Sequence, residues 1–277
     1  MNDNNLCPVP KGTLLIIGGH EAKGTDRAEP FILETFVKLA GGEHAISEVV
    51  TTASAEGEGS FEPYAELFRK LGASSVGHIH HDEPKDALGN EYHERLQAAT
   101  GVFFSGGDQL KLTSIYGGTP LLMQLKQRYI YDPLILGGTS AGAMAMSTPM
   151  IYAGTDQDQL TVGNVKIAVG LEFLKDVCVD THFVDRSRFV RMAQVVATNP
   201  TSIGIGIEEN TALIVRDGKD CRVIGTGVII IIEGFRITHS DITEVNRKRT
   251  VFIDDLTVRI LANGNTYEIP KFDIPHF

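Results

Sequence analysis

Short apolar runs alternate with amphipathic segments through the first half of the chain. The runs that predict buried strands are 13–17, 45–51, 75–80, 102–104 and 134–136. The segments whose apolar residues recur with helical spacing are 31–39, 64–71, 92–98 and 121–129. Strands that alternate with helices are typical of βαβ units, in which a parallel sheet carries helices on both faces. The pattern therefore predicts an α/β fold.

The pattern changes in the second half, where strand-like runs follow one another without helices between them. These runs are 211–215, 222–224, 228–232, 250–253 and 256–261. Turns such as Asp217-Gly218 separate them, which indicates antiparallel β structure appended near the C-terminus. No Ser/Pro-rich linker or internal repeat divides the sequence, so we expect a single domain covering residues 1–277.

Composition narrows the class of protein. Of 277 residues, 42% are hydrophobic and 22% charged, which excludes collagen-like, coiled-coil and largely disordered chains. The 25 Lys and Arg against 35 Asp and Glu leave a net charge of −10, which argues against a nucleic-acid partner. Cys7, Cys178 and Cys221 are few, odd in number and far apart, which favours a reducing compartment over a disulfide framework.

The polar start of the chain and its short apolar runs predict a cytoplasmic protein without a membrane partner. Residues 1–5 are polar and lead to no apolar stretch, so no signal peptide is expected. The longest apolar run, 228–232, is far shorter than the roughly 20 residues that cross a bilayer. The sequence leaves the oligomeric state open, with a homodimer as one option, and it predicts no metal or other cofactor.

Residues 134–143 combine an apolar strand, a G-x-S-x-G motif and the start of a helix. In this motif Ser140 stands between small residues, which a sharp strand-to-helix turn requires because its backbone is strained. Such a turn holds the serine Oγ clear of the sheet, and the helix N-terminus offers N–H groups to a developing oxyanion. Ser140 is therefore the predicted nucleophile.

A serine nucleophile needs an adjacent base, and two of the nine histidines compete for this role. His182 follows an apolar strand and precedes a predicted helix at 186–197, which puts it at the same strand edge as Ser140. His239 would give the order serine, acid, histidine of α/β-hydrolases, but it falls in the all-β part of the chain. We therefore prefer His182 as the base.

Other histidines carry weaker interpretations. His78, His80 and His81 form a cluster that would need further ligands to hold a metal, so a solvated loop at a strand end is preferred. His20 follows the first strand, on the edge where ligands bind to such sheets. Contact with substrate and a bystander role both stay open for His20, and the bystander role is favoured.

A base histidine also needs a carboxylate to orient it and to stabilise its cation. Residues 203–207 read as a buried strand that is followed by Glu208 and Glu209. Because side chains alternate along a strand, one of these two acids points toward His182. Alternation alone does not say which one, and a solvated pair of acids remains the alternative.

Five motifs span most of the chain in a fixed order. They are Gly-Thr-Leu-Leu-Ile-Ile-Gly-Gly at 12–19, Phe-Ser-Gly-Gly-Asp-Gln at 104–109, Gly-Gly-Thr-Ser-Ala-Gly-Ala at 137–143, Asp-Thr-His-Phe at 180–183, and Gly-Ile-Gly-Ile-Glu-Glu-Asn-Thr-Ala-Leu at 204–213. Together, these motifs resemble those of the cyanophycinase family, serine exopeptidases of the peptidase E clan.

This resemblance implies a flavodoxin-like fold similar to that of class I glutamine amidotransferases, with serine in place of their cysteine. It implies hydrolysis of β-aspartyl linkages in cyanophycin, a polyaspartate whose side chains carry arginine. The products would be β-Asp-Arg dipeptides.

The resemblance also implies roles for individual residues. Ser140, His182 and Glu209 match the nucleophile, the base and the orienting acid. The N–H groups of Gly107 and Ala141 match the oxyanion hole. The implied substrate-binding set is Gln109, Asp180, Thr181, Arg186, Arg188 and Arg191.

Departures from the family pattern affect the expected substrate preference. Thr181 stands where the family has a glutamine, so a hydroxyl replaces an amide. Asp156 and Asp158 lie where a pocket glutamate is expected, and each is one methylene shorter. None of these changes touches the predicted nucleophile, base or acid.

Two other functions stay open. An aspartyl dipeptidase of the peptidase E type would share the serine turn and the sheet, but the arginines after His182 favour a substrate rich in carboxylates. The alternative for each arginine is a solvated helix face, and Arg188 and Arg191 share one face of the predicted helix. A catalytically silent binding protein on the same scaffold is the remaining interpretation.

Overall fold

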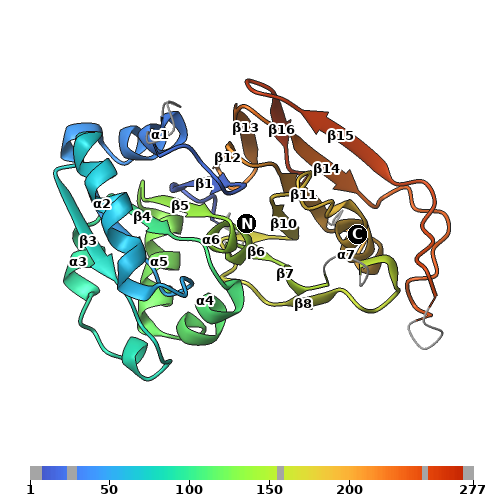
Figure 1. The fold of residues 1–277 in the computed structure, drawn as a ribbon, viewed down its shortest axis with the longest axis horizontal. Helices are drawn as coiled ribbons and strands as arrows, with labels where there is room; N and C mark the ends of the chain where they lie inside the picture. Colours follow the sequence, from blue (N-terminus) through green and yellow to red (C-terminus); the bar gives the residue numbers. More distant parts are fainter. Residues whose placement is uncertain (1–7, 24–29, 155–158, 245–248, 271–277) are drawn as a thin grey trace, which may run out of the picture.

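The computed structural model describes residues 8–23, 30–154, 159–244 and 249–270, and Figure 1 shows their arrangement. The predicted pocket positions Asp156 and Asp158 lie outside these ranges, as does Cys7. Among the helices of the described ranges, none is long and apolar enough to cross a membrane.

The larger sheet contains the parallel strands that the first half of the sequence predicts. Its eight strands, in spatial order, are β16 (Thr266–Glu268), β13 (Asp220–Gly225), β12 (Thr211–Arg216), β1 (Thr13–Ile17), β5 (Ile135–Thr139), β4 (Gly101–Phe104), β2 (Ile46–Val50) and β3 (Ser75–Ile79). From β1 to β3 all neighbours are parallel, whereas β12, β13 and β16 extend the sheet as antiparallel strands.

Helices cover both faces of this sheet, and side-chain alternation along the strands decides which face each residue serves. Leu15 and Ile17 of β1 pack on one face, and Leu14 and Ile16 pack on the other. The first face carries α1 (Phe31–Leu39) and α2 (Phe61–Lys70), and the second carries α3 (His93–Ala98), α4 (Gln109–Tyr116) and α5 (Pro120–Tyr131). Short 3₁₀ turns occur at Gly42–His44, Gly57–Ser60 and Asp86–Leu88.

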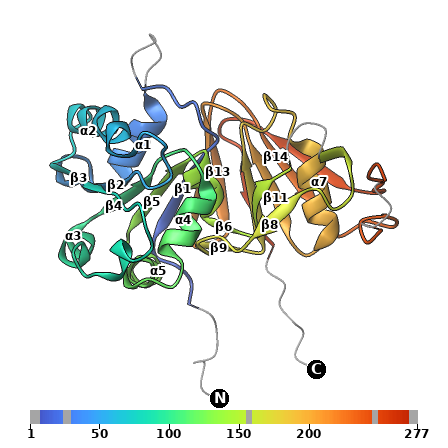
Figure 2. The ribbon, with the colours of Figure 1, turned by 60° about the horizontal axis from the view of Figure 1, so that its bottom comes forward.

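A second sheet stands beside the first (Figure 2). Its six strands, in spatial order, are β15 (Thr257–Leu261), β14 (Ile229–Glu233), β11 (Ile203–Ile207), β10 (Val177–Thr181), β6 (Ser147–Thr148) and β9 (Leu174–Lys175). The central pair, β10 and β11, is parallel, and β14 runs antiparallel to β11. Two further strands, β7 (Met150–Ala153) and β8 (Lys166–Ala168), form an antiparallel pair of their own.

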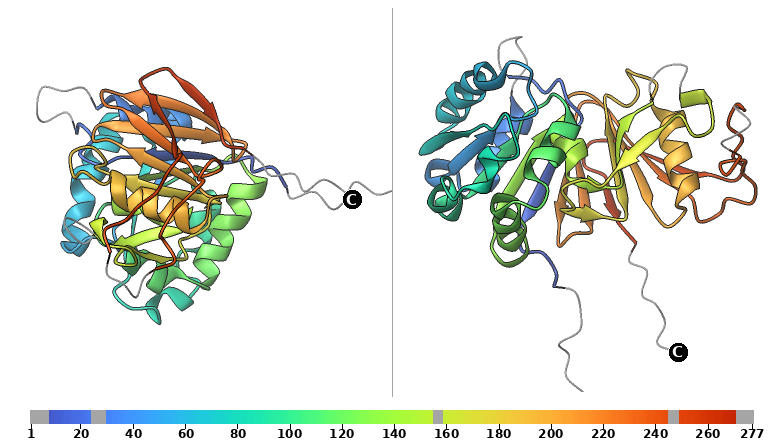
Figure 3. Two further views of the ribbon diagram at one scale, coloured as in Figure 1. Left: turned by 90° about the vertical axis from the view of Figure 1, so that its right-hand side faces the viewer. Right: turned by 90° about the horizontal axis from the view of Figure 1, so that it is seen from below.

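The second sheet lies between the first half of the molecule and one helix. Val179 and Ile205 belong to a core that also contains Leu14 and Leu136 of the first sheet. The opposite face is covered by α7 (Phe189–Thr198), which packs through Met192 (Figure 3). The two sheets therefore share one hydrophobic core.

The structure confirms the α/β class, but it distributes the strands over two main sheets where the sequence predicts one. The sequence predicts one parallel sheet with antiparallel strands appended, whereas the runs that precede His182 and Glu208 form the centre of the second sheet. Segment 250–253 is not a strand, because it makes only isolated bridges from Thr250 and Ile253. Phe252 is 54% exposed and no residue of 250–253 is buried, so this segment has no face buried in a core.

Two helices also differ from the expectation. The predicted helix at 186–197 begins only at Phe189, because Ser187 has a φ of 51°, which no α-helix accommodates. The apolar spacing does not predict helix α4, and the structure leaves Leu110 on its first turn 38% exposed. Its start is marked instead by Asp108, whose carboxylate accepts a hydrogen bond of 2.8 Å from the N–H of Leu110.

Two glycines on one face of β11 allow close packing next to His182. A Cβ on Gly204 would lie 2.7 Å from Met192 Cγ of α7. A Cβ on Gly206 would lie 2.3 Å from the ring of Phe183, the residue that follows His182. The absence of a side chain at Gly206 therefore sets the position of the segment that carries the histidine.

We predict that Gly206→Ala lowers the free energy of unfolding by about 1–3 kcal/mol, because the added methyl group overpacks against Phe183. Chemical denaturation measures this loss. Gly89→Ala is the matched control, because Gly89 has a φ of −75° and the nearest atom to its Cβ position is 4.0 Å away. Equal stability of the two variants would contradict the packing argument.

Candidate active site

Ser140 lies at the turn between β5 and α6 (Ala141–Ala145), in a strained backbone conformation. Its φ of 51° and ψ of −116° lie outside the regions that L-residues favour. A Cβ on Gly138 would lie 2.7 Å from the carbonyl oxygen of Gly142, and a Cβ on Gly142 would lie 2.3 Å from that of Phe104. The small residues of the motif are therefore required for the turn that presents the serine.

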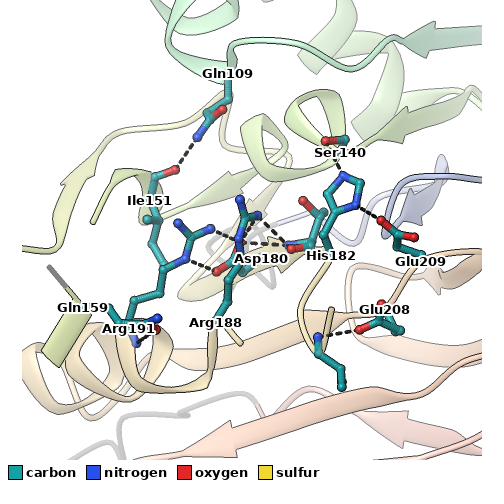
Figure 4. A network of polar contacts seen from close by, with 12 residues as sticks. Gln109, Ser140, Ile151, Gln159, Asp180, His182, Arg188, Arg191, Glu208 and Glu209 are labelled. Carbon is teal, nitrogen blue, oxygen red and sulfur yellow. Dashed lines mark hydrogen bonds and ion pairs between the residues drawn. The ribbon is translucent and has the colours of Figure 1, made fainter. Parts of the chain in front are cut away.

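Two hydrogen bonds link Ser140 to a histidine and a carboxylate (Figure 4). Ser140 Oγ lies 3.0 Å from His182 Nε2, and His182 Nδ1 lies 2.6 Å from Glu209 Oε1. The side chain of His182 is 9% exposed and that of Glu209 is 28% exposed. With its proton on Nδ1 facing the carboxylate, the imidazole has Nε2 free to accept the serine proton. The three predicted residues thus form the geometry of a nucleophile, a base and an orienting acid.

The backbone at the end of β1 holds the three segments that carry the nucleophile, the base and the acid. Three consecutive carbonyl groups each accept one backbone hydrogen bond. The carbonyl of Ile17 accepts from the N–H of Ser140 (3.1 Å), that of Gly18 from His182 (2.9 Å), and that of Gly19 from Asn210 (2.9 Å). Gly19 has a φ of 98°, and a Cβ there would lie 2.4 Å from the His182 ring. Only glycine leaves room for the imidazole at this position.

Glu209, and not Glu208, is the acid that faces His182. Glu208 points away and its Oε2 accepts hydrogen bonds from the N–H groups of Val184 (2.5 Å) and Asp185 (3.1 Å). Both acids follow the last residue of β11, so strict strand alternation does not apply to them. The loop conformation decides the choice that the sequence pattern leaves open.

The backbone N–H groups of Gly107 and Ala141 are the predicted oxyanion donors. Gly107 has a φ of 143°, and a Cβ there would lie 2.0 Å from the carbonyl oxygen of Ala53. The preceding Gly106 adjoins Ser140, since its Cβ position is 3.4 Å from the serine Cβ. Within the described ranges the N–H groups of Gly107 and Ala141 donate to no protein acceptor. Their role as oxyanion donors stays a prediction.

Asp180 is fully buried and is paired with two arginines from the start of α7. Arg191 donates from Nε to Asp180 Oδ2 (2.6 Å) and from Nη2 to Oδ1 (2.5 Å). Arg188 donates from Nη1 to Asp180 Oδ1 (3.1 Å) and to the carbonyl oxygen of Thr181 (2.8 Å). The side chains of Arg191 and Arg188 are 3% and 11% exposed, which excludes a solvated helix face for both.

The two buried arginines differ in the donors that remain. Asp180 takes both Nε and Nη2 of Arg191, whereas the buried Nε of Arg188 has no partner in the described ranges. Burial lowers the pKa of Arg188 to about 10, so the guanidinium is still charged at neutral pH. Arg188 therefore keeps donor capacity next to the strand end that carries His182.

The other members of the predicted substrate-binding set have different surroundings. Gln109 donates from Nε2 to the carbonyl oxygen of Ile151 on β7 over 2.8 Å. Thr181 is fully buried and its Oγ1 has no hydrogen-bond partner in the described ranges. Arg186 lies on the exposed turn before α7. Direct contact of these residues with a substrate stays a prediction.

Of the other histidines, His20 lies next to the site and His239 lies away from it. His20 is 78% exposed, and its Nδ1 lies 3.6 Å from Glu209 Oε2. The rival base, His239, is exposed in the loop after β14. Among the described residues no group of three or more His, Cys, Asp or Glu side chains is arranged to hold a metal ion.

The three histidines at the end of β3, of which His78 lies within the strand and His80 and His81 follow it, are hydrogen-bonded and not simply solvated. His78 Nε2 and His80 Nδ1 lie 2.7 and 2.8 Å from Thr51 Oγ1. His81 is buried, with Nδ1 3.1 Å from the hydroxyl of Tyr116. Burial, and secondly the neighbouring His80, lower the pKa of His78, so its imidazole is neutral at pH 7. The expectation of a solvated loop is therefore wrong for these side chains.

Sequence reasoning missed a buried acid behind the nucleophile. Glu21 accepts hydrogen bonds from Thr139, the residue before Ser140, and from Tyr64 on α2. Its position just after Gly18-Gly19, at the carboxyl end of the first strand, was the available signal.

Comparisons with known proteins agree with this geometry. Residues 14–223 match the family described as peptidase family S51. A cyanophycinase of Synechococcus elongatus is 34% identical over 266 residues, which cover 96% of this chain and 82% of that protein. A cyanophycinase of Geminocystis herdmanii (strain PCC 6308) is 31% identical over 257 residues, 93% of each chain.

Two solved structures share the fold. The crystal structure of a peptidase from an acI-B1 actinobacterium has a TM-score of 0.67 at 23% identity and covers 94% of this chain and 98% of its own. The crystal structure of a putative peptidase E protein from Listeria monocytogenes EGD-e has a TM-score of 0.52 at 16% identity, with coverage of 78% and 99%. With a family match over most of its length and relatives above 30% identity over nearly all of it, the chain belongs to peptidase family S51.

Proposed function

We propose that this protein is a serine exopeptidase that degrades cyanophycin, a polymer built of β-aspartyl-arginine units, and releases β-Asp-Arg dipeptides. The observation that carries the proposal is the hydrogen-bonded chain from Ser140 Oγ through His182 to Glu209, with bonds of 3.0 and 2.6 Å. The 31–34% identity to cyanophycinases supports the choice of substrate. Because the β-Asp-Arg dipeptide keeps its β-aspartyl link to arginine, the amide that is cleaved must join successive aspartyl units. This corrects the expectation that the β-aspartyl linkage itself is hydrolysed.

Acylation follows from the geometry of the site. Ser140 Oγ attacks the carbonyl carbon of the scissile amide while His182 Nε2 takes the hydroxyl proton. The carboxylate of Glu209 holds the Nδ1 proton and stabilises the imidazolium that forms. The N–H groups of Gly107 and Ala141 donate to the oxyanion of the tetrahedral intermediate. His182 then gives its proton to the leaving amine, and the carbon–nitrogen bond breaks.

Deacylation uses the same groups in the reverse sense. His182 takes a proton from a water molecule, whose oxygen attacks the ester carbonyl of the acyl-enzyme. Collapse of the second tetrahedral intermediate returns the proton from His182 to Ser140 Oγ and frees the carboxylic acid product.

Arg188 is our candidate for binding a substrate carboxylate. Its side chain is 11% exposed, against 3% for Arg191, and in the described ranges only its Nη1 donates to protein acceptors. Asp180, held from its other side by Arg191, fixes the direction of the Arg188 guanidinium. Arg191 then acts as a positioning residue, because its Nε and Nη2 are both engaged by Asp180. A substrate that carries one carboxylate per unit complements a site that holds a buried, charged guanidinium.

We further propose that the whole chain acts as one hydrolytic domain in the cytoplasm. The core shared by the two sheets supports a single unit, since Val179 and Ile205 pack in the same cluster as Leu14 and Leu136. The candidate site draws on both sheets, with Ser140 at the end of β5 and His182 at the end of β10.

The first of three predictions about the proposed function tests the activity itself. Incubation of the protein with purified cyanophycin should release soluble β-Asp-Arg, identified by mass analysis, and Ser140→Ala and His182→Ala should each lower turnover by about 10⁶-fold. His239→Ala is the control and should stay close to the unmodified protein. Cleavage of aspartyl dipeptides without cleavage of the polymer would favour the peptidase E type of activity. Failure of a serine-directed acylating probe to label Ser140 would favour a silent binding protein.

The second prediction concerns the orienting acid. Glu209→Gln should keep the fold but lower kcat by about 10⁴-fold, because an amide permits the wrong imidazole tautomer and does not stabilise the cation. Steady-state kinetics on soluble oligomers of the dipeptide unit measure the effect. Glu208→Gln is the matched control, since an amide oxygen can still accept from Val184 and Asp185. A larger loss in Glu208→Gln would show that the acid is misassigned.

The third prediction separates the two buried arginines. Arg188→Ala should raise KM for the same oligomers about tenfold with little change in kcat, because a charge pair formed equally in ground and transition states is uniform binding. Arg188→Lys should restore only part of the affinity, because ammonium lacks the planar fork of guanidinium. Arg191→Ala should instead lower the free energy of unfolding by about 3–5 kcal/mol, since it leaves Asp180 short of its main partner. An unchanged, salt-insensitive KM in Arg188→Ala would rule out its contact with substrate carboxylates.

A further inference from the structure

A buried carboxylate lies behind the nucleophile. It belongs neither to the predicted catalytic residues nor to the cluster of Asp180 and its two arginines. The side chain of Glu21 is only 2% exposed. Its Oε2 accepts a hydrogen bond of 2.5 Å from Thr139 Oγ1, and its Oε1 accepts one of 2.9 Å from the hydroxyl of Tyr64. Among the described residues, the cation within 4.0 Å of Glu21 is Lys23, whose Nζ is 3.9 Å from Oε1 and whose side chain is 39% exposed.

These contacts tie three elements together at the edge of the sheet that presents Ser140. Glu21 follows β1, Thr139 is the last residue of β5, and Tyr64 lies on α2. β1 and β5 are paired in parallel with Ile17 opposite Thr139, so the bond from Thr139 to Glu21 extends the link between these strands beyond their last backbone pair. The side chain of Thr139 is almost fully buried, at 3% exposure.

The backbone of Ser140 needs such support because its conformation is unfavourable by itself. A residue with φ of 51° outside the allowed regions costs about 1–3 kcal/mol and persists only where its surroundings enforce it. The N–H of Ser140 is held by the carbonyl oxygen of Ile17 over 3.1 Å. The side chain of the preceding residue is held by Glu21, so the turn is fixed at two adjacent points.

We propose that Glu21 is a positioning residue for the nucleophile, which acts through the hydroxyl of Thr139 and keeps Ser140 Oγ in line with His182. This inference rests on the proposed function, because it assigns a role in the same reaction. A carboxylate suits this task, since it accepts from both hydroxyl groups at once and charge-assisted hydrogen bonds are roughly twice as strong as neutral ones.

The state of Tyr64 agrees with this role. Burial, and secondly the charge of Glu21, raise the pKa of Tyr64 well above its usual value. The phenol therefore remains protonated and donates to the carboxylate over the working pH range. A direct contact of Glu21 with a substrate guanidinium is excluded, because Thr139 and Tyr64 occupy its two oxygens and 2% exposure leaves no access.

Two matched substitutions each remove one donor from the same carboxylate. Thr139→Val keeps the shape and β-branching of the side chain but removes the bond next to Ser140. We expect it to lower kcat on cyanophycin oligomers, and the rate of Ser140 acylation by a fluorophosphonate probe, by about 10- to 100-fold, because small misplacements of reacting groups are costly. KM should change by no more than about twofold.

Tyr64→Phe removes the other donor and leaves the bond from Thr139 in place. Its acylation rate should fall by no more than about threefold. Denaturation curves of both variants, with kinetics measured where both are folded, separate positioning from stability. Equal acylation rates in Thr139→Val and Tyr64→Phe would overturn the inference, since they would show that Glu21 only stabilises the fold.

Substitutions of Glu21 itself distinguish the loss of its hydrogen bonds from a general disturbance of the fold. Glu21→Gln should retain more activity than Glu21→Ala, because the amide oxygen accepts from one hydroxyl and the amide N–H donates to the other oxygen. Activity of Glu21→Gln no higher than that of Glu21→Ala would also overturn the inference. Failure of the proposed function has a separate signature: the unmodified protein would then not react with the probe at all, whereas failure of this inference leaves the unmodified protein reactive.

Discussion

The carbonyl groups of Ile17, Gly18 and Gly19 hold the serine, the histidine and the residue after the acid at the end of β1, through hydrogen bonds of 2.9 to 3.1 Å. This is possible because β1 lies between β5, which is parallel to it, and β12, which is antiparallel. One neighbour ends at the carboxyl edge of β1 and the other begins there. The last residue of one and the loop before the other therefore meet at the same point, and β10 reaches it from the second sheet.

Backbone strain is concentrated at this same point. Four residues other than glycine have a positive φ around the end of β1, and they are His20 (49°), Ser140 (51°), His182 (47°) and Asn210 (48°). Each costs free energy that neighbouring hydrogen bonds must offset. The turns at Ser140 and His182 direct their side chains from strand ends into the site, where the two side chains are hydrogen-bonded. Strain and hydrogen bonding at this edge are therefore two aspects of one arrangement.

Two buried carboxylates, Asp180 and Glu21, also position the residues of the site. Asp180 and Glu21 are both inaccessible to solvent, yet each is matched by different donors. Two guanidinium groups surround Asp180, which leaves net positive charge beside the site in a chain whose overall charge is −10. Two neutral hydroxyls donate to Glu21 behind the nucleophile, and the partly exposed Lys23 lies 3.9 Å from its Oε1. This distribution suits a substrate that brings its own carboxylates to the side lined by arginine.

Local patterns in the sequence predicted much of the fold and the chemistry. Alternating strands and helices predicted the parallel sheet, and the small residues around Ser140 predicted the strained turn, because both are properties of a few adjacent residues. The same locality explains the errors. Segment 250–253 has the composition of a strand, but no neighbouring strand pairs along it, and strand formation depends on such a partner.

Only the tertiary structure decided how distant residues meet. The pattern around Glu208 and Glu209 allows either acid to face the histidine, and the choice falls to Glu209 because Asn210 bonds to Gly19, nearly two hundred positions earlier in the chain. Arg188 and Arg191 have the spacing of an exposed helix face, yet both turn inward because Asp180 lies on the adjacent strand. Glu21 reads as an ordinary polar residue after a strand, and its burial depends on Thr139 and Tyr64. The sequence by itself determined which groups can react and where the chain must turn, since these are local constraints. Which carboxylate meets which donor depends on packing between segments far apart in the chain, and only the folded molecule brings them together.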